Sequence, residues 1–334
     1  MKTWRETQAV FANASRLLSS GEAVALATLV RIEGHCCRRV GSRLLIHRDG
    51  SISGPRTGGC LEADLRERAV RMLQSGAPPE LIEYETGPQD KLWGLGMEPN
   101  GRVDVFLQRL EPPLDPVFEE INQRFTGIES FAIRTVLDGL DAGQIFVGPP
   151  FTDERSGIVL DDGDRIFVHH VDSPPHLVVV GAGEDAIPLV RIGADVGFRV
   201  TVVDHRDETL SPANFPAARA LVHARPDAPL PDDIPRNVQT YAILMYHDAA
   251  MNEAWCQAFA RTATPYIGVV RRGSKRAPWI DRLPKDIRVR VREPAGLPIG
   301  AEGPEQVAIS ILVEFLALES GQLSALLRDP AAAI

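Results

Sequence analysis

Residues 176–204 read HLVVVGAGEDAIPLVRIGADVGFRVTVVD, and this stretch decides the fold of the second half of the chain. A valine-rich run leads into a turn that contains Gly181 and Gly183. An apolar helical pattern follows, and a second valine-rich run ends at Asp204. Strand, turn, helix and strand make a βαβ unit, and the turn matches the G-x-G-x-x-A pattern of dinucleotide-binding folds. The stretch therefore predicts a Rossmann-like domain.

The segments around this unit repeat the alternation of strand and helix. Further strands are expected at residues 219–223, 240–246 and 266–270. A long final helix is expected to begin near Pro304, because proline suits the first helical position. This pattern is typical of a doubly wound parallel sheet. The stiff Pro174-Pro175 pair interrupts regular structure, so we expect one domain at 1–172 and another at 176–334.

The first 172 residues are expected to form a mixed α+β domain, which makes the whole chain an α/β protein. Its strands are expected at residues 22–32, 43–47, 80–86, 103–110, 131–137, 144–147 and 166–171. Asp49-Gly50 indicates a hairpin turn after the second of these. An amphipathic helix precedes the first strand. Another runs from Cys60 to about Gly76, where glycine suits the end of a helix.

The run Gly58-Gly59-Cys60-Leu61-Glu62 is the strongest candidate site in this first domain. Two glycines let the backbone turn, and Cys60 is then expected in the first turn of the helix. There, unpaired N–H groups and the helix dipole stabilise a thiolate that suits a soft metal. The alternative is a small core residue. Glu62 is a candidate base or hydrogen-bond acceptor, or it only stabilises the helix dipole.

The cysteines also allow a zinc-site hypothesis, which has less support from their spacing. Cys60 with His35, Cys36 and Cys37 offers the donor types of a zinc site, but the spacing does not match a C-x₂-C pair. The alternative for the His35 segment is a polar turn between strands. Four cysteines in 334 residues are too few for a disulfide framework, which favours reduced thiols and a cytoplasmic protein.

Basic and polar side chains mark further candidate positions. Arg38 and Arg43 are candidates to hold an anion near Cys60, or they belong to a solvated edge. Arg271 and Arg272 directly follow an expected strand, where a phosphate or nucleotide site and a solvated loop are both plausible. His247 ends another strand at its carboxyl end, where open α/β sheets bind ligands, and its alternative role is structural.

The Rossmann turn itself gives a mixed signal. Gly181 and Gly183 would let a phosphate approach the helix start. Glu184 and Asp185 lie where a pyrophosphate would be and would repel it. Asp204 is expected to accept a hydrogen bond from a ribose hydroxyl, or else to cap a helix or pair with Arg206.

Composition excludes several function classes. The formal net charge of -9 argues against general nucleic-acid binding. No apolar run approaches the roughly 20 residues needed to span a bilayer, so no membrane partner is expected.

The assembled pattern resembles the xanthine dehydrogenase accessory family, XdhC/CoxI. The resemblance rests on the Cys60 run, on the Rossmann segment with Val202-Val203-Asp204-His205-Arg206, and on two further segments. One extends from Ala27 through Gly34 and Arg38 to Gly41-Ser42-Arg43-Leu44-Leu45. The other is Leu297-Pro298-Ile299-Gly300 with the helix that begins at Pro304. The glycine-cysteine-glycine-glycine stretch of many members is absent from residues 94–101, so Cys60 would act alone.

The resemblance implies a molybdenum cofactor chaperone without turnover of its own. Such a protein binds molybdopterin or its dinucleotide form and receives it from a biosynthesis or nucleotidyl transferase protein. It protects the cofactor while a cysteine desulfurase partner supplies the sulfido ligand. It then inserts the cofactor into an apo molybdenum hydroxylase of the xanthine dehydrogenase, aldehyde oxidoreductase or carbon monoxide dehydrogenase type. Members are often homodimers.

On this resemblance, Cys60 would contact molybdenum, and Arg38 and Arg43 would hold the anionic part of the cofactor. Two other functions compete with the chaperone. One is an NAD(P)-dependent oxidoreductase that uses the Rossmann half. The other is a zinc- or thiol-based hydrolase, in which Cys60 would have to meet His247 from the other domain.

Overall fold

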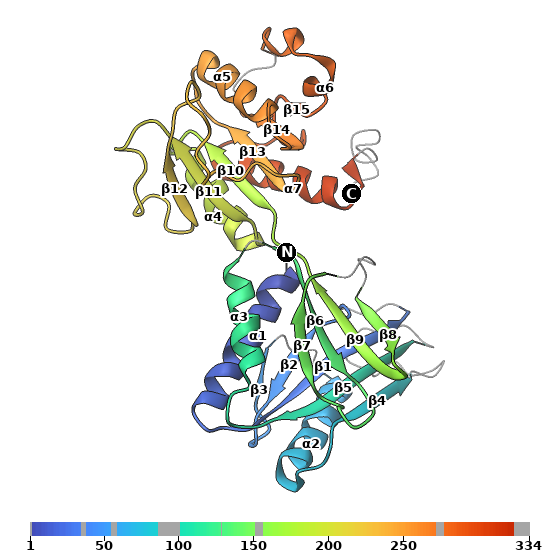
Figure 1. The fold of residues 1–334 in the computed structure, drawn as a ribbon. Helices are drawn as coiled ribbons and strands as arrows, with labels where there is room; N and C mark the ends of the chain where they lie inside the picture. The colour runs from blue at the N-terminus through green and yellow to red at the C-terminus, as the bar shows by residue number, and fades with distance from the viewer. Residues whose placement is uncertain are drawn as a thin grey trace. The chain divides into compact units, whose positions relative to one another are not determined.

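A computed structural model describes residues 2–34, 38–54, 59–85, 101–127, 129–150, 156–271 and 277–323. Of residues 2, 3, 59 and 60 it describes the backbone alone. The chain divides into two compact units, Met1–Ser173 and Pro174–Ile334. Figure 1 follows the chain through both.

The described strands of the N-terminal unit form two antiparallel sheets. The first has the order β3-β2-β1-β5-β4, and the second has the order β7-β6-β9-β8. The strands of the first sheet are β1 (Val24–Glu33), β2 (Arg43–Ile46), β3 (Ile52–Ser53), β4 (Glu80–Glu85) and β5 (Arg102–Leu110). Those of the second are β6 (Phe131–Val136), β7 (Ile145–Gly148), β8 (Gly157–Asp161) and β9 (Asp164–Val171). The hairpin predicted at Asp49-Gly50 joins β2 to β3.

Three helices cover the first sheet on both of its faces. They are α1 (Lys2–Ser19), α2 (Gly59–Ser75) and α3 (Pro116–Thr126). Alternate residues of β1 point to opposite faces. Leu26 therefore packs in one cluster with Phe11 of α1 and Phe118 of α3. Ala27 packs in another cluster with Leu65 of α2. This burial on both faces explains why β1 reads as a nearly continuous apolar run.

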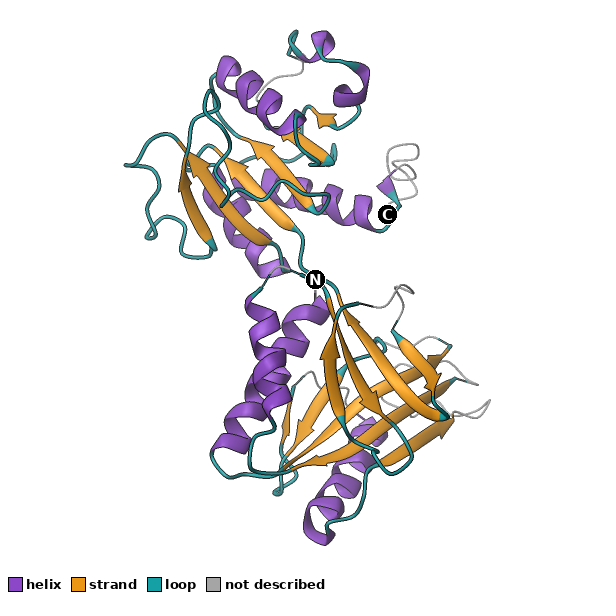
Figure 2. Cartoon of the chain, viewed as in Figure 1, coloured by secondary structure: helices purple, strands orange, loops and turns teal. Residues whose placement is uncertain are grey.

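The C-terminal unit is built on one parallel sheet of six strands, coloured orange in Figure 2, with the order β12-β11-β10-β13-β14-β15. The strands are β10 (His176–Val180), β11 (Arg199–Asp204), β12 (Ala220–His223), β13 (Thr240–Leu244), β14 (Tyr266–Val269) and β15 (Val291–Arg292). In chain order this is 3-2-1-4-5-6, the strand order of the Rossmann fold. The predicted fold class is confirmed. β15 was missed because two residues carry no periodic signal.

Helices lie on both faces of this sheet. They are α4 (Ala186–Val196), α5 (Ala249–Ala260), α6 (Lys285–Arg288) and α7 (Pro304–Glu319), with a short 3₁₀ helix at Ile280–Arg282. Gly193 of α4 lies close to Leu312 of α7. Trp255 and Cys256 of α5 are fully buried among β-strand side chains. Cys256 is therefore a core residue, and burial raises the pKa of its thiol to about 12. Among the described helices, none has the length and apolar character required to cross a bilayer.

Candidate functional site

The turn after β10 brings the backbone very close to the end of β13. Gly181 has a φ of +105°, and a Cβ at this position would lie 3.2 Å from the backbone of Met245 and of Tyr246. Its N–H donates to the carbonyl oxygen of Val203 at 2.8 Å. Gly181 is thus required by a close approach and by a backbone conformation that favours glycine. Gly183 is exposed, and no atom outside its own turn lies within 4 Å of the place where a Cβ would be.

Asp204, at the end of β11, is buried, and neighbouring residues already donate hydrogen bonds to its carboxylate. Its carboxylate is 0 % exposed and accepts from the N–H of Ala182 at 2.6 Å. The guanidinium of Arg206 donates to both carboxylate oxygens, at 3.0 and 2.8 Å. Burial alone would raise the pKa of Asp204, but the hydrogen bonds from Arg206 and Ala182 outweigh it and lower the pKa to about 2. Of its expected roles, the structure gives Asp204 the pairing with Arg206 and leaves neither carboxylate oxygen open to a ribose hydroxyl.

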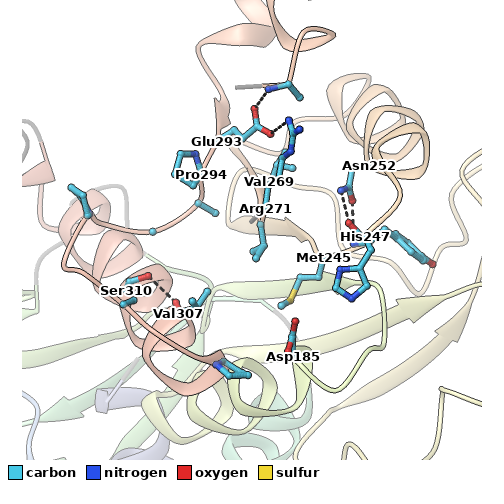
Figure 3. A pocket seen from close by; sticks show the side chains of 18 of the residues that line it. Asp185, Met245, His247, Asn252, Val269, Arg271, Glu293, Pro294, Val307 and Ser310 are labelled. Carbon is cyan, nitrogen blue, oxygen red and sulfur yellow. Dashed lines mark hydrogen bonds and ion pairs between the residues drawn. The ribbon is translucent and has the colours of Figure 1, made fainter. Parts of the chain in front are cut away.

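The strand order of this sheet reverses between β10 and β13. Asp204 lies on the β11 side of this point, and a cleft of about 690 Å³ lies on the β13 side. Its walls come from the carboxyl ends of β13 and β14, the segment after β15, and the starts of α5 and α7 (Figure 3). Asp185 contributes from the turn before α4. The volume lies within the range typical of small-molecule and cofactor sites.

Two of the predicted site residues meet in this cleft. His247, directly after β13, and Arg271, directly after β14, both line it. Parallel strands end at the same edge of a sheet, which explains why residues 24 positions apart come together. The neighbouring Asp248 caps α5, because its side chain accepts from the N–H of Ala250 at 2.8 Å.

The other Rossmann residues expected at the site are placed differently. Gly181, Gly183 and Asp204 are not among the residues that line the cleft. Arg272 lies outside the described residues. The turn that carries Gly183 reaches the cleft only through Asp185.

Side chains that the sequence did not single out complete the cleft. Asn252 donates to the carbonyl oxygen of Tyr246 at 2.7 Å and accepts from the Tyr246 N–H, which fixes the turn between β13 and α5. Glu293 lies after β15 and faces Arg271 in Figure 3, with 3.7 Å between Oε1 and Nη1. Trp279 adds a buried aromatic wall. An acidic residue after a two-residue strand carries no sequence signal of its own.

The wall formed by the segment after β15 is held from behind. Glu314 of α7 is 4 % exposed, and its Oε2 accepts from the Tyr266 hydroxyl at 2.6 Å and from the Gly296 N–H at 2.7 Å. Burial, together with the adjacent Glu314, raises the pKa of Tyr266 well above its usual value. Gly296 has a φ of +98°, and a Cβ there would collide with Ser310. This wall of the cleft is therefore held in one conformation.

The helix predicted at Cys60 is confirmed, since α2 begins at Gly59. Cys60 occupies the first helical turn, and the structure describes its backbone and not its side chain. Glu62 is half-buried in the same turn. Gly58, His35, Cys36 and Cys37 lie outside the described residues. The thiolate and zinc interpretations therefore stay predictions. Within the described part of the chain, no group of three or more His, Cys, Asp or Glu side chains is arranged to hold a metal ion.

Arg43 corrects one expectation from the sequence. We expected an anion-binding side chain, but Arg43 is 3 % exposed inside the N-terminal unit. Its Nη1 donates to Nδ1 of His169 at 2.6 Å and to the Gly41 carbonyl oxygen. Burial lowers the pKa of Arg43 to about 9, and its Nη2 has no hydrogen-bond partner among the described residues. An anion in solvent cannot reach this guanidinium. Arg38 is part of an ion pair, 3.9 Å from Glu6.

Residues 177–315 match the model of the XdhC Rossmann domain, and residues 17–85 match the model of the XdhC and CoxI family. The chain belongs to the XdhC and CoxI family. The two matched regions include the Cys60 run and the whole described cleft, so the resemblance inferred from motifs is confirmed in both halves.

Three relatives of this XdhC and CoxI family chain align with 89 % or more of its length. A probable xanthine dehydrogenase subunit of Bacillus subtilis is 27 % identical over 317 residues, which cover 90 % of this chain and 94 % of the relative. The molybdenum cofactor insertion chaperone PaoD of Escherichia coli is 26 % identical over 305 residues, or 89 % and 84 % of the two chains. A Bacillus halodurans crystal structure, described as a xanthine dehydrogenase, superimposes with a TM-score of 0.71 at 25 % identity and covers 93 % of this chain and 96 % of that one.

Proposed function

We propose that this protein binds the molybdenum cofactor and inserts it into an apo molybdenum hydroxylase. The observation that carries the proposal is the similarity to a molybdenum cofactor insertion chaperone over 89 % of this chain. The cleft supports it, because its volume suits a ligand of cofactor size and Arg271 supplies a cation for an anionic group. The cofactor is cargo here, so the protein needs no turnover of its own.

The proposal names candidate contacts in each unit by itself. In the C-terminal unit, the cleft suits the pterin and phosphate part of the cargo, with Arg271 and His247 as polar contacts. Cys60 supplies the soft contact to molybdenum, because a thiol in the first helical turn ionises readily and a thiolate binds soft metals. Molybdopterin and its dinucleotide form remain equal candidates.

The proposal also includes the partners expected for such a carrier. A biosynthesis or nucleotidyl transferase protein delivers the cofactor. A cysteine desulfurase supplies the sulfido ligand while the cofactor is held. The client is an apo hydroxylase of the xanthine dehydrogenase, aldehyde oxidoreductase or carbon monoxide dehydrogenase type, the compartment is the cytoplasm, and the carrier is a homodimer.

The direct test is to purify the protein from cells that make the cofactor and to measure the pterin it retains. Denaturation and oxidation release a fluorescent pterin, and we expect an amount approaching one per chain. Purified loaded protein should also activate an apo molybdenum hydroxylase. A protein that carries no pterin and activates no client would overturn the proposal.

The role of Cys60 is tested with Cys60→Ala, which should lose the cofactor while the fold stays intact. The matched control is Cys256→Ala, which removes a thiol from the core of the C-terminal unit and should keep the cofactor once folded. Equal retention by Cys60→Ala and the parent would make Cys60 structural.

The nicotinamide-dependent alternative is weakened by the position of Asp204, because Arg206 occupies the carboxylate that would bind a ribose. It makes a distinct prediction, namely an absorbance change at the nicotinamide band when the protein is incubated with NAD(P)H and a substrate. We expect no such change.

A further inference from the structure

Glu293 is a buried carboxylate in the cleft with an unused hydrogen-bond acceptor. Its side chain is 2 % exposed. Oε2 accepts from the N–H of Ala277 at 2.6 Å, which fixes the orientation of the carboxylate. Oε1 is buried and has no hydrogen-bond partner among the described residues, and the nearest cation is Arg271 at 3.7 Å (Figure 3). That distance is too long for a hydrogen bond.

A buried acceptor that receives no hydrogen bond, such as Oε1 of Glu293, reduces the stability of the fold unless a ligand donates to it. A buried polar atom without a hydrogen-bond partner loses its hydrogen bonds with water and forms none in return, and the loss is larger for a charged group. Arg271 is near enough to offset the charge, but it gives Oε1 no hydrogen bond. The Oε1 of Glu293 therefore indicates a position that a ligand donor completes.

The surroundings of Glu293 define the shape of that ligand. Pro294 and Ala295 directly follow Glu293 in the wall of the cleft, and Trp279 also lines the cleft. A flat ring system suits such walls. A carboxylate oxygen accepts N–H donors, and an amino group next to a ring N–H presents two of them side by side.

We propose that Glu293 recognises the 2-amino-4-oxo-pyrimidine edge of the pterin, which carries this pair of donors. The inference rests on the proposed function, since it names the part of the cargo that this end of the cleft reads. With Glu293 in this place, the site selects a ring that donates a hydrogen bond at the 2-position. It disfavours a ring that carries only an acceptor there.

Arg271 exchanges partners when the cargo binds. Its side chain is 42 % exposed, and in the part of the chain that is described its contact with Glu293 is its only ion pair. Before the cargo binds, the guanidinium balances the charge of the buried carboxylate. On binding, it turns to the phosphate of the cargo, because guanidinium and phosphate form paired, charge-assisted hydrogen bonds. The pterin N–H groups then take its place at Oε1.

The test compares two simple ring systems that differ at one position. Pterin carries the 2-amino group, whereas lumazine carries an oxygen there, and both are fluorescent enough to titrate. The full-length parent should bind pterin at least about tenfold more tightly, which is the size expected of one hydrogen bond to a charged acceptor. This measurement needs no variant.

The variant Glu293→Gln adds a second, directional readout. With its amide oxygen on the Ala277 N–H, the amide nitrogen becomes a donor at the place of Oε1, so the preference should fall below twofold or turn toward lumazine. The matched control is Glu253→Gln, the same chemical change at a residue of α5 that does not line the cleft and that pairs with Arg282. It should keep the parent preference. Thermal unfolding of each variant confirms that it is folded.

Three results overturn the assignment of Glu293. They are equal binding of pterin and lumazine by the parent, binding of neither, and an unchanged preference in a folded Glu293→Gln. The amount of cofactor that the parent retains on purification is measured separately, so a wrong assignment of Glu293 is distinguishable from a failure of the carrier function.

Discussion

Replacing Gly181 with alanine should destabilise the C-terminal unit, whereas the same change at Gly183 should not. The two glycines are two positions apart in the same turn, so the pair isolates the effect of local geometry. At Gly181 the φ is +105°, and the new methyl group would meet the backbone of Met245 and Tyr246 at 3.2 Å. At Gly183 the space is open.

The magnitude follows from two costs at Gly181. Holding a non-glycine residue in a sparsely populated backbone region costs about 1–3 kcal/mol. A contact of 3.2 Å with backbone also requires the ends of β10 and β13 to separate by a few tenths of an ångström, which loosens their packing. We expect a total of about 2–3 kcal/mol for Gly181→Ala. For Gly183→Ala we expect a change within about 0.5 kcal/mol, the usual range for an open surface position.

Hydrogen exchange measures this difference in the intact chain. Peptides that cover β10 and β13 should exchange about 30- to 150-fold faster in Gly181→Ala, because each 1.4 kcal/mol changes an opening constant about tenfold. Peptides from the N-terminal unit serve as the internal control and should not change. Equal protection in the parent and Gly181→Ala would refute the reasoning, since it would mean that the turn relaxes without cost.

Two further predictions follow from basic side chains. Arg38→Ala should weaken cofactor retention more at low salt than at high salt. Arg43→Met should show no such salt dependence, because Arg43 is enclosed within the N-terminal unit. Retention is measured as released pterin, and equal losses in the two variants would contradict this contrast. His176 is held neutral, because burial, with Arg199 and Arg219 adding to it, lowers its pKa to about 4. Neutral His176 therefore contributes fully to the free energy of unfolding above pH 6.5, and this contribution is lost as the pH falls toward 4. At pH 5 the loss is about 2 kcal/mol. In urea unfolding at pH 7 and pH 5, the parent should lose about that much more than His176→Gln, and identical pH dependence would count against the argument.

Much of the fold was predictable because its signals are local. The βαβ unit is encoded by two valine-rich runs and by a glycine at the one turn position where a side chain would meet backbone. The start of α2 at Gly59 follows from two glycines and a helical period after them. The positions of His247 and Arg271 at one edge of the sheet follow from a rule about where parallel strands end.

The chemistry of individual charged residues was predictable only in part. Arg43 looks in the sequence like its neighbours Arg38 and Arg39, yet it is enclosed in the N-terminal unit against His169, 126 positions away. Asp204 could have faced a ligand, and only the folded chain shows that Arg206 occupies it. Whether a charge is open to solvent depends on residues that approach it from distant segments.

The linear order of residues was enough to establish the family, the parallel sheet and the succession of its elements, because periodicity, glycine turns and helix starts act over a few neighbouring residues. The place of the cleft and the carboxylates that line it follow only from the folded chain. Glu293 meets Ala277, 16 positions earlier, and Glu314 holds Gly296 and Tyr266 from another helix. These contacts are set by how the helices pack on the sheet, and packing depends on residues that are far apart in the chain.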